Sequence, residues 1–128
     1  MLKFKLSAFS DEAAVSFDEQ LQALKEEGIA LTELRSSDGK NCAALTLEEA
    51  KGLRKKLDAA GMNLSSLGSP YGKIAINEDF EPHYQSFLHG LELCKVLECD
   101  QIRMFSFFIP KGTEADPWRD EVFARLEK

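Results

Sequence analysis

The feature that most constrains the fold is a short apolar segment followed by an amphipathic helical segment, repeated along the chain. Two of the apolar segments open directly on a glycine, at 28–34 (GIALTEL) and 61–67 (GMNLSSL). Glycine readily takes the left-handed conformation that ends many helices, so each one marks the passage from a helix into a strand. Strands joined through helices pair in parallel, and parallel sheets gather ligands at the carboxyl ends of their strands. The pattern predicts an α/β fold and indicates where a site would lie.

Four strands and four helices are expected in alternation. The strands are expected at about 2–9, 29–35, 62–67 and 101–107. Capping boxes at 16–19 (SFDE) and 46–49 (TLEE) predict the starts of the first two helices, because the Ser or Thr and the Glu side chains satisfy free amides there. A third helix is expected at 79–98 and a fourth after 116–117, whereas the polar, turn-rich stretch 36–44 predicts a loop.

Two architectures fit this order of elements. One is an open doubly wound parallel sheet of four strands, and the other is half of an eight-stranded βα barrel, whose usual length is about 250 residues. The apolar stripe of the last helix, with Phe123 and Leu126, runs to the end of the sequence without a closing glycine or proline. We therefore interpret 1–128 as a single α/β domain and expect it to be the amino-terminal half of a longer barrel.

The composition argues against several classes of function. A net charge of −6 disfavours nonspecific binding to nucleic acid, which depends on clustered Lys and Arg. Cys42, Cys94 and Cys99 lack metal-ligand spacing and predict reduced thiols in a cytoplasmic protein. His83 and His89 are six residues apart on the third predicted helix, on different faces, which predicts helix packing and no shared metal. No apolar run approaches the ~20 residues that span a bilayer, so no membrane partner is expected.

Charged residues near the ends of predicted strands are candidate site residues. Glu33 and Arg35 are two apart, so they share one face of a strand, and Arg103 interrupts another apolar run. An unpaired buried charge costs several kcal/mol, so these residues either pair with one another or face a wet cavity. An internal ion pair without a ligand remains open, but the position at strand ends favours a polar binding site over the sheet.

Two loops complete the predicted edge of the sheet. The adjacent carboxylates Asp11 and Glu12 are interpreted as favouring the dipole of the following helix. The segment 68–74 (GSPYGKI) departs from a phosphate-binding P-loop, because only three residues separate its glycines and Ile74 stands where Ser or Thr would hold magnesium. A nucleoside triphosphatase is therefore rejected. Lys73 remains a candidate contact for one phosphate or carboxylate, with a solvated loop lysine as the alternative.

Taken in order, the four predicted strand ends resemble those of a known family. They read FSDE at 9–12, ELR at 33–35, GSPYGK at 68–73 and IRMFSF at 102–107. In this order they resemble the amino-terminal half of the sugar phosphate isomerase/epimerase family, which has the xylose-isomerase-like TIM barrel and is related to endonuclease IV. The resemblance covers essentially the whole chain, although no single motif is highly specific.

The resemblance implies a (βα)8 barrel of which this chain supplies the first four βα units, a half-barrel. The family binds a divalent metal, manganese, magnesium or zinc, and performs metal-assisted proton transfer between adjacent carbons of a keto-sugar or related polyol. Its metal ligands, typically two Glu, an Asp and a His, come from strands five to eight. The resemblance therefore implies that this chain alone binds no metal and is inactive as an isomerase, and it leaves the catalytic residues unknown.

By the same resemblance, Glu33 and Arg35 line the mouth of the site, Lys73 reaches the substrate or covers the pocket, and Arg103 lies within the barrel. The expected partner is a small-molecule sugar, and exposed sheet edges predict self-association. A non-catalytic α/β module that binds a carbohydrate or a protein is the alternative function. A relative of DNA-repair endonucleases is disfavoured by the acidic charge.

Overall fold

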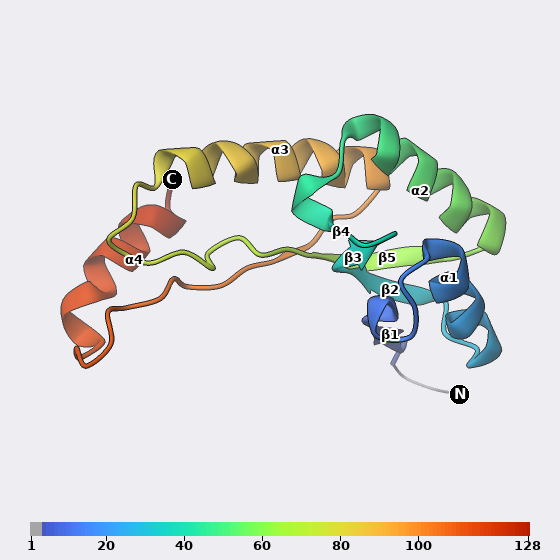
Figure 1. The fold of residues 1–128 in the computed structure, drawn as a ribbon, viewed down its shortest axis with the longest axis horizontal. Coiled ribbons are helices and arrows are strands. Elements are labelled where there is room, and N and C mark those ends of the chain that lie inside the picture. Colours follow the sequence, from blue (N-terminus) through green and yellow to red (C-terminus); the bar gives the residue numbers. More distant parts are fainter. Residues whose placement is uncertain (1–3) are drawn as a thin grey trace.

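A computed structural model describes residues 4–128 and shows helices packed on a parallel sheet (Figure 1). All three pairings in the four-stranded sheet are parallel, and the order of strands follows the sequence without a reversal. The strands in spatial order are β1 (Ser7–Ala8), β2 (Leu31–Leu34), β5 (Asn63–Gly68) and β6 (Ile102–Arg103). The predicted α/β class with parallel strands is confirmed.

Three of the four helices that the structure describes pack on one side of this sheet, namely α1 (Phe17–Glu26), α2 (Leu47–Ala60) and α3 (Glu81–Leu97). The fourth is α4 (Arg119–Leu126), and the short 3₁₀ turns are η1 (Ser10–Glu12), η2 (Cys42–Ala44) and η3 (Asp116–Trp118). In Figure 1, α2 and α3 lie together above the sheet, and α4 stands apart at the far end of the molecule. None of the helices described for residues 4–128 is long and apolar enough to cross a bilayer.

One hydrophobic core joins α1, α2 and α3 to the sheet. Its members include Phe17, Leu21, Leu24, Leu34, Leu53, Leu57, Leu64, Leu67, Leu93 and Leu97. In β2, Thr32 and Leu34 are fully buried, whereas Glu33 between them is half-buried. Side chains alternate between the faces of a strand, so Glu33 belongs to the face opposite the helices. We call this the uncovered face of the sheet.

The first three helices end in the same way, in a Schellman motif. A left-handed residue follows each helix, namely Gly28 (φ 67°), Gly61 (φ 68°) and Glu98 (φ 54°). The next residue donates its backbone N–H to the carbonyl five positions back in the chain, which satisfies a free carbonyl. The residues joined in this way are Leu24 and Ile29 (2.9 Å), Leu57 and Met62 (2.9 Å), and Cys94 and Cys99 (3.0 Å).

The predicted capping box at 46–49 is confirmed, because Thr46 and Glu49 exchange side chain to backbone hydrogen bonds. The box predicted at 16–19 is wrong. Ser16 is the N-cap of α1, but its side chain makes no capping bond, and the N–H of Phe17 donates to Oδ1 of Asp38 instead (3.0 Å). The fold brings Asp38 there from a later segment, which local sequence does not reveal.

The stretch predicted as a loop at 36–44 contains a small hairpin, so that prediction is corrected. Strands β3 (Ser36–Ser37) and β4 (Lys40–Asn41) pair antiparallel. The two turn residues, Asp38 (φ 51°) and Gly39 (φ 77°), are both left-handed, as two-residue hairpins require.

The predicted strand at 101–107 is too long, because only Ile102–Arg103 joins the sheet. Beyond it, residues 105–108 run beside residues 71–76, through bonds from Phe105 N to Tyr71 O (2.8 Å) and from Phe107 N to Gly72 O (3.0 Å). Figure 1 shows the two segments running side by side from the sheet to α4.

At the other end of the chain, the start of the strand predicted at 2–9 lies outside the described residues. Phe4 and Leu6 are exposed, and β1 begins at Ser7.

Candidate functional site

The uncovered face of the sheet carries an ion pair between two of the predicted site residues. Nε of Arg103 donates to Oε1 of Glu33 at 2.5 Å, although the two residues are 70 positions apart in sequence. The side chains are 31% and 21% exposed, so the pair is partly shielded from solvent and still open to a ligand. The sequence left two alternatives, an internal ion pair and a solvent-accessible binding site. The exposure of this pair is compatible with both.

Gly68 explains how this pair forms. Glu33 lies on β2 and Arg103 on β6, with β5 between them, so the two side chains reach across roughly 10 Å of sheet. Gly68 of β5 pairs with Arg103, and a Cβ at Gly68 would lie 3.1 Å from Cγ and Oε1 of Glu33 and 3.3 Å from Nη2 of Arg103. Because Gly68 has no side chain, it leaves room for the side chains of Glu33 and Arg103 to meet across β5.

Arg35 lies near this pair and binds the loop that follows β1. Its Nε donates to Oδ2 of Asp11 (2.8 Å) and its Nη2 to Oε1 of Glu12 (3.2 Å). The hydrogen bond to Asp11 is the main reason that the pKa of Arg35 is raised above its ordinary value. The interpretation of Asp11 and Glu12 as helix-dipole residues is wrong, because they pair with Arg35 and α1 begins only at Phe17.

Two phenylalanine rings join the cations into a continuous row. The guanidinium of Arg35 lies 4.8 Å from the ring centre of Phe9, and that of Arg103 lies 5.4 Å from the same ring. Arg103 also lies 4.9 Å from the ring centre of Phe105, and Nζ of Lys73 lies 4.5 Å from it. Cations over aromatic faces are attracted by the ring quadrupole. The structure therefore brings all four sequence-predicted residues together, and we call these four, with their partners Asp11, Glu12, Phe9 and Phe105, the charged row.

A buried polar network fixes the loop that carries Phe9 and Asp11. Oγ of Ser10 donates to Oε1 of Gln20 (2.9 Å) and shares a hydrogen bond with Oγ1 of Thr32 (2.8 Å), and all three residues are buried. Such networks, when fully satisfied, fix one arrangement of the backbone around them. The loop after β1 is thus tied to both α1 and β2 before any ligand arrives.

Sequence reasoning missed Phe9, Phe105 and Gly68 as parts of this site. One available signal was Gln20, a polar residue within the apolar stripe of Phe17, Leu21 and Leu24, which marks a buried polar contact. The role of Gly68 depends on strand register, which no local pattern gave.

The described residues do not fit a divalent metal. No group of three His, Cys, Asp or Glu side chains within residues 4–128 has the arrangement to hold one. On the charged row, Glu33 and Asp11 already accept from guanidinium groups. The two histidines have packing roles, as predicted: Nε2 of His83 accepts from the N–H of Gly72 (2.7 Å), and Nε2 of His89 bonds to the carbonyl of Leu45 (2.8 Å).

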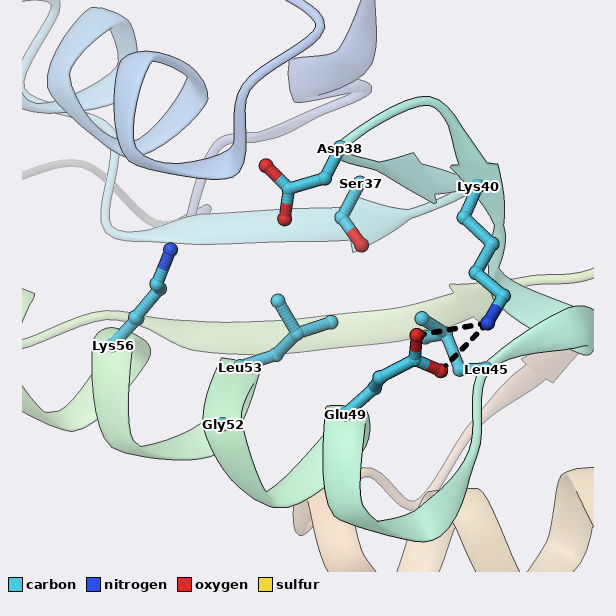
Figure 2. A pocket seen from close by; sticks show the side chains of 8 residues that line it. All are labelled: Ser37, Asp38, Lys40, Leu45, Glu49, Gly52, Leu53 and Lys56. Carbon is cyan, nitrogen blue, oxygen red and sulfur yellow. Dashed lines mark hydrogen bonds and ion pairs between the residues drawn. The ribbon is translucent and has the colours of Figure 1, made fainter.

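A separate cavity of about 240 Å³ lies between the β3–β4 hairpin and α2 (Figure 2). Its charged lining residues hold the fold together. Lys40 makes two 2.8 Å hydrogen bonds to Glu49, which belongs to the capping box of α2, and Lys56 pairs with Asp18 of α1 (2.8 Å). The charged row also contains ion pairs, but it includes Lys73, a cation with no carboxylate partner among residues 4–128, so the charged row is the stronger candidate site.

The charged row combines three cations with three carboxylates. Within residues 4–128, Lys73 alone among its cations has no carboxylate partner, so it is free to bind an anion. The paired groups retain donors and acceptors that suit hydroxyls. No family model and no curated protein sequence matches this chain. Any assignment of function therefore depends on its own residues and their geometry.

Proposed function

We propose that the charged row binds a sugar phosphate or a closely related polyol phosphate. In this proposal the chain is a half-barrel that supplies the substrate-binding wall of a sugar phosphate isomerase/epimerase. The observation that carries it is the Glu33–Arg103 pair, which spans Gly68 on the uncovered face of the sheet.

The strand order supports a half-barrel over a doubly wound sheet. Right-handed crossovers that always step in the same direction place every helix on the same face of the sheet. A doubly wound sheet instead reverses its strand order at a switch point, which puts helices on both faces. Here the order β1-β2-β5-β6 has no reversal, and α1, α2 and α3 share one core. The uncovered face would then be the interior of a barrel.

The side chains of the row match the parts of a phosphorylated sugar. Lys73 offers an ammonium group to the phosphate from the loop that follows β5, at the carboxyl end of the sheet. Glu33 and Arg103 offer an acceptor and donors to neighbouring hydroxyls, because neither side chain is fully buried. Phe9 and Phe105, which are both half-buried, offer apolar surface to the carbon skeleton.

The proposed role of this chain is to bind and orient the substrate. Proton transfer in the proposed reaction class needs a metal and a free acid–base pair, and the described residues fit neither, since the carboxylates of the row are paired with arginines. We accordingly expect no isomerase or epimerase turnover from this polypeptide in isolation.

Calorimetric titration with matched pairs of keto-sugars and keto-sugar phosphates tests the proposal. Lys73→Met is expected to weaken binding of the phosphorylated member at least tenfold, about 1.4 kcal/mol, and to leave the free sugar nearly unchanged. Arg103→Met is expected to weaken both. Lys95→Met is the matched control, because Lys95 pairs with Glu92 on the exposed side of α3. Equal binding of inorganic phosphate and sugar phosphate, or no effect of Lys73→Met, would contradict the proposal.

The second candidate is a non-catalytic module that binds carbohydrate through the same row. The observation in its favour is that Glu33 and Asp11 are both held by guanidinium groups, which suits recognition better than proton abstraction. Such a module would bind a keto-sugar phosphate and its reduced polyol phosphate equally well. Clear preference for the keto form supports the isomerase class.

We also propose that the edge strands β1 and β6 pair with further strands, from a second copy or from elsewhere in a longer barrel. Unpaired edges of a sheet are templates for such pairing. Sedimentation of this chain over a range of concentrations tests self-association, and a monomer at every concentration would contradict pairing between copies.

A further inference from the structure

The carboxyl end of α3 differs from the ends of α1 and α2 in one chemical respect. In a Schellman motif, the residue that donates the long backbone bond packs its side chain against the residue that accepts it. In α1 and α2 these contacts join apolar residues, Leu24 to Ile29 and Leu57 to Met62. In α3 the equivalent positions are Cys94 and Cys99.

The motif holds these two cysteines close together. The N–H of Cys99 donates to the carbonyl of Cys94 at 3.0 Å, and the N–H of Glu98 donates to the carbonyl of Lys95 at 3.3 Å. Both side chains belong to the hydrophobic core at this helix end, and the thiol of Cys99 donates to the carbonyl of Gln101 at 3.3 Å. Both are free thiols and both are buried, with 7% and 6% of the residue exposed.

We propose that Cys94 and Cys99 form a dithiol that closes reversibly to a disulfide by exchange with small-molecule disulfides. Backbone proximity is one geometric requirement for a disulfide, and the Schellman motif brings the backbones of Cys94 and Cys99 together at the end of α3. The inference is independent of the proposed sugar site.

The exchange takes place in two steps. The Cys99 thiolate attacks one sulfur of a small disulfide, whose S–S bond breaks, and one thiolate leaves while a mixed disulfide forms. Cys94 then loses its proton to solvent, and its sulfur attacks the Cys99 sulfur and expels the second small thiolate. The protein loses two electrons and two protons, and the small disulfide is reduced to two thiols.

The environment favours Cys99 as the attacking residue. The hydrogen bond from Cys94 lowers the pKa of Cys99 below the ordinary value of a thiol, whereas the same bond and burial raise the pKa of Cys94. Access comes through the end of the helix, where Glu98 and Asp100 on either side of Cys99 are exposed. Helix ends open locally more easily than helix interiors.

Cys42 provides an internal comparison. It is fully buried, and burial raises its pKa to about 11. Within residues 4–128, no helix-end motif joins Cys42 to another cysteine as one joins Cys94 to Cys99. Cys42 is therefore expected to stay a free thiol.

The test is disulfide mapping of the full chain after incubation with glutathione disulfide. Acid stops the exchange, and free thiols are then alkylated with N-ethylmaleimide in denaturant near neutral pH. Trypsin cuts after Lys95, so that a closed disulfide links peptides 74–95 and 96–103. The expected result is this linked pair, with Cys42 alkylated and the link reversed by dithiothreitol. Full alkylation of all three cysteines, a lasting glutathione adduct on the wild-type chain, or a link to Cys42 would overturn the proposal.

Two variants and one condition sharpen this test. Cys94→Ala is expected to trap glutathione on Cys99, because no second thiol resolves the adduct, and an unmodified Cys99 would count against the mechanism. Cys42→Ala, the matched control, is expected to form the link to the same extent. The effective concentration of the two thiols is expected to be at least about tenfold higher in the folded chain than in urea. Equal values would show that the motif does not position them.

Discussion

The most specific stability prediction concerns Gly90 in α3 and the ring of Tyr71. Tyr71 is 1% exposed and lies against the helix at Gly90. A Cβ added at Gly90 would lie 2.7 Å from Cε2 and 2.8 Å from Cζ of Tyr71, and nearer still to its hydroxyl. Gly90→Ala therefore tests whether Tyr71, in the loop after β5, packs directly against α3 at Gly90.

The magnitude follows from two opposing effects. Alanine is favoured over glycine inside a helix by about 1 kcal/mol. Overpacking a buried site costs ~1–3 kcal/mol, and contacts this short with two ring atoms and the hydroxyl of a buried side chain place the cost near ~3 kcal/mol. The net loss of unfolding free energy for Gly90→Ala is thus about 2 kcal/mol, or a fall in Tm of roughly 8 °C for a domain of this size.

Gly52→Ala in α2 is the matched control, because nothing lies within 4 Å of a Cβ at Gly52. It keeps the helical advantage alone and is expected to raise stability by about 1 kcal/mol. Urea unfolding followed by circular dichroism measures both variants. If Gly90→Ala is as stable as Gly52→Ala, the packing described for Tyr71 is wrong.

A second substitution, Tyr71→Phe, separates the effect of the Tyr71 hydroxyl on stability from the effect of its ring. Oη of Tyr71 is buried without a hydrogen bond among the described residues, although Ser86 lies beside it. Tyr71→Phe is therefore expected to change stability by less than about 0.5 kcal/mol, since no hydrogen bond is lost. In that background the cost of Gly90→Ala is expected to fall by about 1 kcal/mol, because the nearest atom is gone. An unchanged cost would assign the clash to the ring alone.

Three further predictions concern helix ends and one histidine. Glu98→Gly is expected to raise the unfolding free energy by about 1 kcal/mol in urea titrations, because Glu98 is left-handed at φ 54°, and a loss would contradict that conformation. Thr46→Ala and Asp38→Ala are each expected to cost about 1 kcal/mol, whereas Ser16→Ala is expected to cost almost nothing in the same assay. Burial lowers the pKa of His83, so the unfolded chain binds its proton more tightly. The stability due to neutral His83 is then complete above pH ~6.5 and is lost as pH falls through its folded pKa, and His83→Asn is expected to flatten that part of the pH–stability curve.

Much of the fold could be predicted from the sequence because its signals are local. The glycines at 28 and 61 mark helix ends, and Thr46 with Glu49 marks a helix start, through bonds between near neighbours in sequence. The cap of α1 could not be predicted in the same way, because Asp38 reaches it from a hairpin more than twenty positions later. Local patterns fail where a distant segment supplies the partner.

The candidate site shows the same difference between features that are local in sequence and contacts that depend on distant segments. The charges at strand ends were visible in the sequence, and the structure brings Glu33, Arg35, Lys73 and Arg103 into one row. Their connections were not visible, because the pairing of Glu33 with Arg103 depends on the order of three strands and on the absence of a side chain at Gly68. In the sequence, Phe9 and Phe105 look like ordinary apolar residues. Only the fold places their rings beside the cations.

Amide chemical-shift mapping during titration with a keto-sugar phosphate tests the central claim most directly. If the uncovered face binds the sugar phosphate, the largest shifts will fall on Glu33, Gly68, Lys73 and Arg103, and Lys73→Met will reduce them at the same subsaturating ligand concentration. Shifts confined to the cavity between the β3–β4 hairpin and α2, or no shifts at millimolar ligand, would contradict it.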